Sequence, residues 1–201
     1  MENKKQFIGA KPVGLLGKIA GILMNIIHKK EYQKIALNIH EESNNNTKTI
    51  VDIGCGGGIT LKIFSKTFNS ATVIGIDYSQ EMVNLSLRIN RKYVKTGRVI
   101  VKKCDVEHIL LDNNSIDLIT AFDNINFWVN YSSAFKEIKR ILKPNGLFYI
   151  INGYPKIGTN WYDFVKFKNE EEYRNLLESN GLSVESIEII KSTIIVKGKL
   201  V

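Results

Sequence analysis

Cysteine, proline and long hydrophobic runs are all scarce in this sequence. Among 201 residues there are only 2 cysteines and 3 prolines. So few cysteines exclude a disulfide-stapled scaffold and fit a reducing compartment, so we expect a cytoplasmic protein; Cys55 and Cys104 could still form a redox pair if the fold brings them together. With 15 glycines and 44% hydrophobic residues, the composition also excludes collagen-like and disordered proteins. The length suits one ordinary domain with its own core.

No transmembrane segment or signal peptide is expected at the N-terminus. The most apolar stretch there, residues 13–27, is too short to span a bilayer and contains Lys18. Basic residues rather than a small-residue cleavage site follow it. Apolar residues spaced by three and four predict an amphipathic helix that packs on the domain or lies on a membrane surface. A second helical stretch, 31–42, ends in the polar run SNNNTK, so we expect residues 1–46 to form a helical arm or lid and 47–201 the main domain.

From residue 49 onward, short apolar runs alternate with helical periods. The predicted strands cover 49–53, 72–76, 98–103, 116–121 and 147–151, and the predicted helices between them cover 59–67, 79–94 and 132–142. This alternation predicts a parallel sheet covered by helices on both faces.

The end of the chain departs from this pattern. A predicted helix over 170–179 is followed by two tightly joined strands over 184–190 and 193–197, which must be antiparallel. The predicted fold class is therefore α/β: a three-layer, doubly wound, seven-stranded and mostly parallel sheet with an antiparallel C-terminal hairpin.

A glycine-rich loop, in the stretch VDIGCGGG from Val51 to Gly58, follows the first predicted strand. A dinucleotide-binding loop would need a glycine where Ile59 stands, and the ending of a phosphate-binding Walker loop is missing. Asp52 is poorly placed beside a pyrophosphate but well placed beside an ammonium group. The loop therefore favours a cofactor with a cationic amino-acid end over one with phosphates.

Five motifs in order resemble the class I S-adenosylmethionine-dependent methyltransferases. They are VDIGCGGG, VIGIDYS, the turn Cys104-Asp105-Val106, IDLITAFDNINFW and EIKRILKPNG, and the resemblance extends from about Thr49 to the end of the chain. The N-terminal arm with Met24-Asn25 and His28 looks like that of small bacterial methyltransferases of undefined substrate. The resemblance implies a Rossmann-like methyltransferase fold, S-adenosyl-L-methionine as cofactor and S-adenosyl-L-homocysteine as product.

Cofactor contacts follow from these motifs. Asp77 ends the second predicted strand, where a carboxylate can accept both ribose hydroxyl hydrogens of an adenosine. Tyr78 and Met82 would flank the adenine, Asp105 would accept from its amino group, and the Val106 amide would reach a ring nitrogen. The predicted cofactor-binding residues are Asp52, Gly54, Cys55, Gly56, Gly58, Asp77, Tyr78, Met82, Cys104, Asp105, Val106 and Phe122.

The acceptor is expected after the fourth predicted strand, because ligands bind at the carboxyl edge of such sheets. Asp123 is the only carboxylate in that segment and is our first candidate for orienting or deprotonating the acceptor. His28 is the second catalytic candidate, because such arms commonly fold over the cofactor in this family. The predicted acceptor contacts are Asn124, Asn126, Phe127 and Trp128. Farther along, Trp161, Tyr162 and Phe164 either stack on a planar acceptor or fill space beside the sheet.

Three functions remain open at this point. The first is methylation of a small molecule by a monomer or homodimer; motifs for DNA adenine methylation and for metal binding are missing from the sequence, so we expect no metal. The second is RNA methylation, which the net charge of +8 suggests. Its predicted footprint is Arg88, Arg91, Lys92, Lys95, Arg98, Lys102 and Lys103. The third is a non-catalytic module that only binds S-adenosylmethionine.

Overall fold

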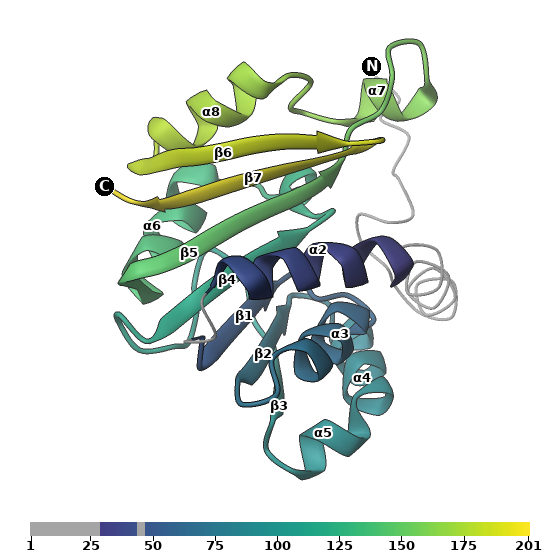
Figure 1. Ribbon diagram of the computed structural model, residues 1–201, viewed down its shortest axis with the longest axis vertical. Helices are drawn as coiled ribbons and strands as arrows, with labels where there is room; N and C mark the ends of the chain where they lie inside the picture. The colour runs from purple at the N-terminus through teal and green to yellow at the C-terminus, as the bar shows by residue number, and fades with distance from the viewer. Residues whose placement is uncertain (1–28, 44–46) are drawn as a thin grey trace.

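A seven-stranded sheet forms the centre of the molecule in the computed structural model, which describes residues 29–43 and 47–201 (Figure 1). The strand order is β3-β2-β1-β4-β5-β7-β6. The strands are β1 (Thr49–Ile53), β2 (Thr72–Asp77), β3 (Val99–Lys103), β4 (Ile116–Phe122), β5 (Leu142–Gly153), β6 (Leu182–Ile190) and β7 (Thr193–Leu200). Strands β1 to β5 run parallel, and β7 pairs antiparallel with both β5 and β6. The predicted fold class is confirmed.

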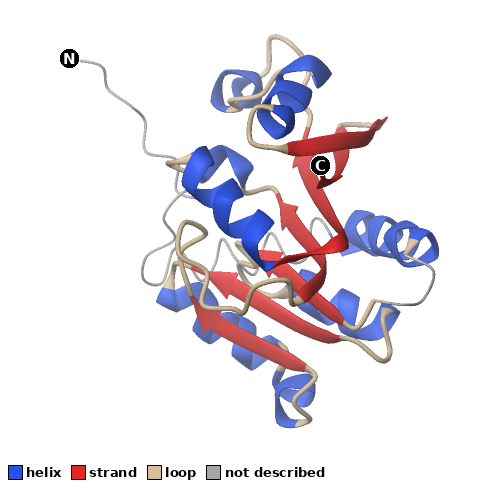
Figure 2. Ribbon diagram, turned by 90° about the vertical axis from the view of Figure 1, so that its left-hand side faces the viewer, coloured by secondary structure: helices blue, strands red, loops and turns tan. Residues whose placement is uncertain are grey.

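Helices cover both faces of this sheet, as Figure 2 shows. They are α2 (Lys29–Glu42), α3 (Ile59–Thr67), α4 (Gln80–Ile89), α5 (Arg91–Lys95), α6 (Tyr131–Ile141), α7 (Asn160–Phe164) and α8 (Glu170–Glu178), with a 3₁₀ turn η1 (Ile125–Phe127) after β4. One core cluster joins the sheet to α2 and α3, and a second joins it to α6 and α8. Because β1 to β5 are parallel, the loops that follow them meet at one edge, called the carboxyl edge below.

Helix α2 belongs to the core of the sheet domain. Its residues Tyr32, Ile35, Ala36 and Ile39 are buried against β1, β4 and α3. At its C-terminal end, Glu42 accepts hydrogen bonds from the Tyr149 hydroxyl at 2.8 Å and from Lys197 at 2.9 Å. The described part of the predicted arm is thus packed into the main domain, while residues 13–27 lie outside the described residues.

Two departures from the predicted elements have a clear structural cause. The helix expected over 79–94 is divided into α4 and α5 at Asn90. The buried Asn90 side chain donates to the carbonyl of Gly58 at 2.8 Å and to that of Ser86 at 3.0 Å. Strand β5 begins at Leu142, directly after α6, because the buried Leu142 pairs with Ile116 before a register shift.

The connection between β3 and β4 contains no helix and is bound by two side chains of α6. Arg140 on α6 donates to the carbonyls of Ile109 at 2.6 Å and Leu111 at 2.7 Å, and it is paired with Glu137 at 2.8 Å. Glu137 in turn accepts from the Ile109 amide at 2.8 Å. These bonds order the segment that begins with the Cys104-Asp105 turn.

Candidate functional site

The glycine loop between β1 and α3 has three left-handed glycines. Gly54, Gly56 and Gly58 have φ angles of +63°, +50° and +80°, a region that favours glycine. A Cβ on Gly54 would lie 2.7 Å from Nδ2 of Asn124, and one on Gly58 would collide with Ser86 Oγ. A Cβ on Gly56 would meet nothing within 4 Å. The two outer glycines are therefore required for packing, whereas Gly56 exposes its main chain to open space that a ligand can enter.

Asp77 links this loop to the end of β2. Its side chain is mostly buried, with Oδ2 accepting from the Gly56 amide and Oδ1 from the Ser79 amide, both at 2.9 Å. Burial raises the pKa of Asp77, and these two amide bonds oppose that rise. A carboxylate oxygen can accept more than one hydrogen bond, so both oxygens retain acceptor capacity for ligand hydroxyl groups.

Asp52 lies beneath the loop and is only 1% exposed. Its oxygens accept from the hydroxyls of Thr60 and Thr120, the latter at 2.7 Å. Burial raises the pKa of Asp52 to about 7, although both threonine bonds lower it. Within residues 29–43 and 47–201, no ion pair includes Asp52. Its contact with a ligand ammonium group stays a prediction.

Both cysteines are buried and free. Sγ of Cys55 fills the space beside Gly75, where a Cβ would lie 2.8 Å away, and burial raises the pKa of its thiol well above the usual value. The Cys104 thiol donates to the carbonyl of His108 at 3.1 Å, and the Cys104 amide donates to that of Asp77 at 2.9 Å. These contacts give both thiols packing roles.

The adenine contacts expected from the sequence lie in different environments. Tyr78 is 43% exposed, and the exposed Asp105 closes its turn by accepting from the Glu107 amide at 3.0 Å. Val106 is half-buried, whereas Met82 is buried within α4. The sheet topology brings these residues together at the carboxyl edge, where each contact with adenine stays a prediction.

The segment after β4 packs tightly around the first loop glycine. Asn124 donates to the Ile53 carbonyl and accepts from Nε1 of Trp128 at 3.1 Å, and both side chains are buried. The Phe122 ring packs in the α2–α3 core, with its centroid 4.6 Å from that of Tyr32. Asn124 therefore packs against the loop, Trp128 is bonded to Asn124, and Phe122 belongs to the core.

Two neighbouring residues face the segment that contains α7. Asn126 accepts from the Lys166 amide at 2.9 Å, and the ring centroid of Phe127 lies 5.5 Å from that of Phe164. Trp161, which is 53% exposed, packs against Phe164 at 5.6 Å. Asn126 and Phe127, two of the predicted contacts to the methyl acceptor, are thus in contact with the segment that contains Trp161 and Phe164. The Trp161 side chain remains partly accessible.

Asp123 lies at the junction of β4, β5 and α2. Its φ angle is +50°, which is unusual for a residue other than glycine. Oδ1 accepts from the Gly153 amide at 2.6 Å, and Oδ2 accepts from the hydroxyl of Tyr32. The sequence analysis missed Tyr32, whose position on the apolar face with Ile35 and Ile39 indicates burial but no partner. His28 lies outside the described residues.

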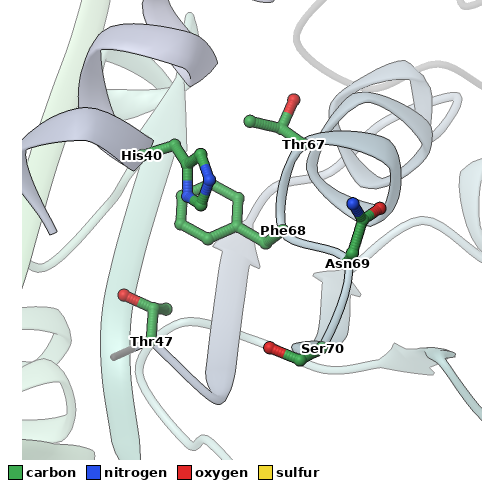
Figure 3. Close-up of a pocket in the computed structure, with 6 residues that line it drawn as sticks. All are labelled: His40, Thr47, Thr67, Phe68, Asn69 and Ser70. Atoms are coloured by element: carbon green, nitrogen blue, oxygen red, sulfur yellow. The ribbon is translucent and has the colours of Figure 1, made fainter. Parts of the chain in front are cut away.

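A surface hollow lies at the opposite edge of the sheet. Its lining consists of His40, Thr47, Thr67, Phe68, Asn69 and Ser70, as Figure 3 shows. Thr47 precedes β1 and Ser70 precedes β2, so the hollow adjoins the amino ends of the strands. It is therefore remote from the glycine loop and contains none of the predicted site residues.

Known proteins share this sequence pattern and fold. Residues 51–150 match the family described as "Methyltransferase domain". A ubiquinone/menaquinone biosynthesis C-methyltransferase from Geotalea daltonii is 35% identical over 98 residues, which cover 48% of this chain and 42% of that protein. The matches span less than two thirds of the length of such curated relatives, from 29% to 59%.

Solved structures extend the similarity to nearly the whole chain. A SAM-dependent methyltransferase from Aquifex aeolicus has a TM-score of 0.77 at 23% identity, covering 92% of this chain and 98% of that one. A geranyl diphosphate C-methyltransferase from Streptomyces coelicolor, solved with S-adenosyl-L-homocysteine, has a TM-score of 0.63 at 18% identity, covering 77% and 71%. At these identities the structural matches establish the fold.

Proposed function

Through residues 51–150 the chain belongs to the class I S-adenosylmethionine-dependent methyltransferases, and from this premise we propose that it transfers the cofactor's methyl group to a small-molecule acceptor. The observation that carries the proposal is the bond from the Gly56 amide to Asp77. It places an accessible main chain beside a carboxylate with spare acceptor capacity, which suits an adenosine and its amino-acid tail.

The residues at the carboxyl edge fit this cofactor. Gly56 leaves room for the ligand, and Asp77 would accept from the ribose hydroxyls. Asp105 and Asp123 add negative charge at the carboxyl edge, which favours a cationic ligand. The cofactor would supply an activated methyl group on a positively charged sulfur.

Because the methyl group is already activated in the cofactor, the main task of the protein is to position the acceptor. The acceptor atom must be held about 3–3.5 Å from the methyl carbon and in line with the sulfur. We expect Asp123 to orient the acceptor, and the connected rings of Phe127, Phe164 and Trp161 to offer it an aromatic surface. Support for a small molecule comes from curated relatives named for ubiquinone and menaquinone biosynthesis and for demethylmenaquinone methylation.

Calorimetric binding of S-adenosylhomocysteine tests the cofactor assignment. We expect micromolar affinity for the wild-type protein and at least a tenfold loss in Asp77→Ala, because the ribose hydroxyls lose a charged acceptor. Asp117→Ala is the control: Asp117 also accepts from backbone amides, those of Lys48 and Thr49 at 2.9 Å, but before β1 at the opposite edge. Unchanged affinity in Asp77→Ala would reject the ribose assignment, and no binding by the wild-type protein would reject the proposed function.

A group of exposed cations supports RNA methylation as a second candidate. Arg88, Arg91, Lys92, Lys95 and Lys103 are exposed, and none forms an ion pair within the part of the chain that the structure describes. They come from α4, α5 and β3, elements that contact one another beside the edge strand of the sheet. We call these five residues the cationic band.

Arg98 must be removed from the predicted RNA footprint. Its guanidinium group donates to the carbonyls of Phe68 at 2.8 Å and Ser65 at 2.9 Å and stacks over the Tyr93 ring. It therefore ties the end of α3 to β3 rather than facing a ligand. Lys102 donates to the Leu110 carbonyl at 3.3 Å, so we also leave it out of the cationic band.

A further inference from the structure

The hydrogen bond between Tyr32 and Asp123 lies where a methyl acceptor would enter. Asp123 directly follows β4, and its neighbour Asn124 contacts both Ile53 and the site of Gly54 at the start of the glycine loop. On its other side, Asp123 accepts from the amide of Gly153 at the end of β5. Asp123 thus adjoins a residue that contacts the cofactor loop, while its own carboxylate is bound to the end of β5.

We propose that Tyr32 is a positioning residue that fixes Asp123 as the group orienting the methyl acceptor. This inference rests on the proposed function. It also assigns an acceptor class: a molecule whose nucleophilic atom carries a hydrogen, as in a hydroxyl or amine, which Asp123 would accept. A further lone pair on each Asp123 oxygen remains for that bond.

The backbone of Asp123 is held in an unusual conformation by its surroundings. A left-handed φ of +50° costs a non-glycine residue free energy and persists where surrounding contacts impose it. The Asp123 amide donates to Ile151 at 2.8 Å, so both main chain and side chain are bound to β5. Tyr32 supplies a further contact, from helix α2 to the other oxygen of the carboxylate.

Tyr32 is suited to remain a hydrogen-bond donor. Its side chain is 6% exposed and packs against Phe122. Burial is the largest cause that raises the pKa of Tyr32 well above the usual value for tyrosine, and the nearby charge of Asp123 is the next largest. The phenol therefore keeps its proton at physiological pH. Nearby, Glu31 accepts a hydrogen bond from Thr193, which fixes the same end of α2 to the start of β7.

The structure contains a matched contact that is purely structural. Tyr149 on β5 also donates to a carboxylate across the α2–sheet interface, that of Glu42 at 2.8 Å. This second pair lies at the other end of α2, away from the carboxyl edge. Tyr32→Phe and Tyr149→Phe therefore each remove one tyrosine–carboxylate bond between α2 and the sheet, and only the first is expected to affect ligand recognition.

Two cofactor analogues test the proposal without knowledge of the acceptor. S-adenosylhomocysteine has no group at the methyl position, whereas sinefungin has an amine-bearing carbon in place of the methylated sulfur. Calorimetry on the full chain gives the ratio of the two dissociation constants for each variant. We expect the preference for sinefungin to fall about tenfold in Asp123→Asn and at least threefold in Tyr32→Phe, and to stay unchanged in Tyr149→Phe.

The outcomes separate this inference from the proposed function. Binding of S-adenosylhomocysteine at wild-type affinity shows that a variant is folded and that its cofactor site is intact. An unchanged ratio in Asp123→Asn, or equal ratios in Tyr32→Phe and Tyr149→Phe, would overturn the positioning role while leaving the proposed function standing. Failure of the wild-type protein to bind S-adenosylhomocysteine would overturn both.

Discussion

At the scale of single residues, the three loop glycines perform different tasks with the same backbone conformation. Gly54 and Gly58 are tightly enclosed, the first by Asn124 and the second by Ser86 and Asn90. Gly56 instead faces open space while its amide donates to Asp77. Substitution should therefore affect stability at the enclosed positions and binding at the open one.

Alanine substitutions separate these two effects. Gly56→Ala should weaken S-adenosylhomocysteine binding at least tenfold, since its methyl group would enter the ligand space, and should cost only the about 1–2 kcal/mol of a left-handed alanine. Gly58→Ala should cost more stability, because its Cβ would also collide with Ser86. Calorimetry and urea denaturation measure the two quantities.

Gly97→Ala is the control for this pair. Gly97 has a φ angle of +73° and nothing within 4 Å of its Cβ position, but it lies in the turn between α5 and β3. Gly97→Ala should lose as much free energy of unfolding as Gly56→Ala does, and it should bind the ligand with wild-type affinity. If Gly56→Ala also binds normally, the ligand does not approach the main chain of Gly56.

Asp52 gives the stability of the protein a specific pH dependence. Because its folded pKa of about 7 exceeds the usual 3.8, the folded protein holds a proton between about pH 4 and pH 7 that the unfolded chain has released. The free energy of unfolding contributed by this group therefore decreases as pH rises through that range, by at most about 1.4 kcal/mol per pH unit, and is constant above it.

Asp52→Asn should remove this contribution. We expect the variant to gain stability relative to the wild-type protein as pH rises from 4 to 8, in urea denaturation at a series of pH values. Asp117→Asn should show no such trend from pH 4 to 8: although burial acts to raise its pKa, the Lys143 bond and the amides of residues 48 and 49 lower it overall, so its contribution changes only below about pH 4. Parallel curves for wild type and Asp52→Asn would contradict the assignment.

At the scale of elements, α2 connects the core to the carboxyl edge. Its apolar face is buried on the sheet, and its two ends are fixed by the Tyr32 and Glu42 hydrogen bonds. In Figure 1 the helix crosses in front of the strands, and its first turns approach their carboxyl ends. A change in the packing of α2 should therefore alter the position of Asp123, which we expect to contact the acceptor.

Substitutions on the two faces of α2 test its place in the core. Ile39 is 2% exposed and Leu37 is 50% exposed. Ile39→Ala should lower the free energy of unfolding by about 2–5 kcal/mol, because it leaves a cavity between α2 and the sheet. Leu37→Ala should change it by less than about 0.5 kcal/mol. Urea denaturation measures both, and equal small effects would show that α2 is a detachable arm.

At the scale of the whole molecule, the net charge of +8 is unevenly distributed. The carboxyl edge has four aspartates, at positions 52, 77, 105 and 123, whereas the cationic band lies along α4, α5 and the edge strand β3. Within residues 29–43 and 47–201, no helix combines the length and apolar character needed to cross a membrane. The site at the carboxyl edge is therefore acidic, although the protein as a whole has a positive net charge.

The cationic band makes RNA binding testable. If it binds RNA, the affinity for a labelled single-stranded RNA should fall steeply with salt, and Lys92→Glu/Lys95→Glu should reduce the slope of log affinity against log salt by about 1.4, the value for two lost phosphate contacts. Lys30→Glu/Lys34→Glu changes the net charge equally on the exposed face of α2.

Fluorescence polarisation distinguishes the outcomes. Loss of the slope only in the band variant supports RNA as the acceptor, while equal losses in both variants indicate a general charge effect. If the wild-type protein shows no salt-sensitive binding, RNA methylation is rejected and the small-molecule proposal remains.

Local patterns predicted most of the elements, and the differences arise at tertiary contacts. The range of β1 and that of α3 agree with their predictions, because apolar runs and helical periods are local properties of the chain. The interruption at Asn90 was not predictable from periodicity, since its cause is a bond to Gly58, 32 residues away. Similarly, nothing in the sequence distinguishes Arg98, which binds carbonyls, from its exposed basic neighbours.

The α/β architecture could be predicted from local sequence patterns, as could the glycine loop and the position of Asp77 at the end of a strand. These features depend on side-chain periodicity and on backbone conformations that only glycine adopts readily. Both can be recognised from residues that are close together in the sequence. Long-range packing, in contrast, determines which acidic residues are buried, which cations bind carbonyls within the protein and which side chain donates to Asp123. Tyr32 and Asp123 are 91 residues apart, and packing α2 across the sheet is what brings their side chains together.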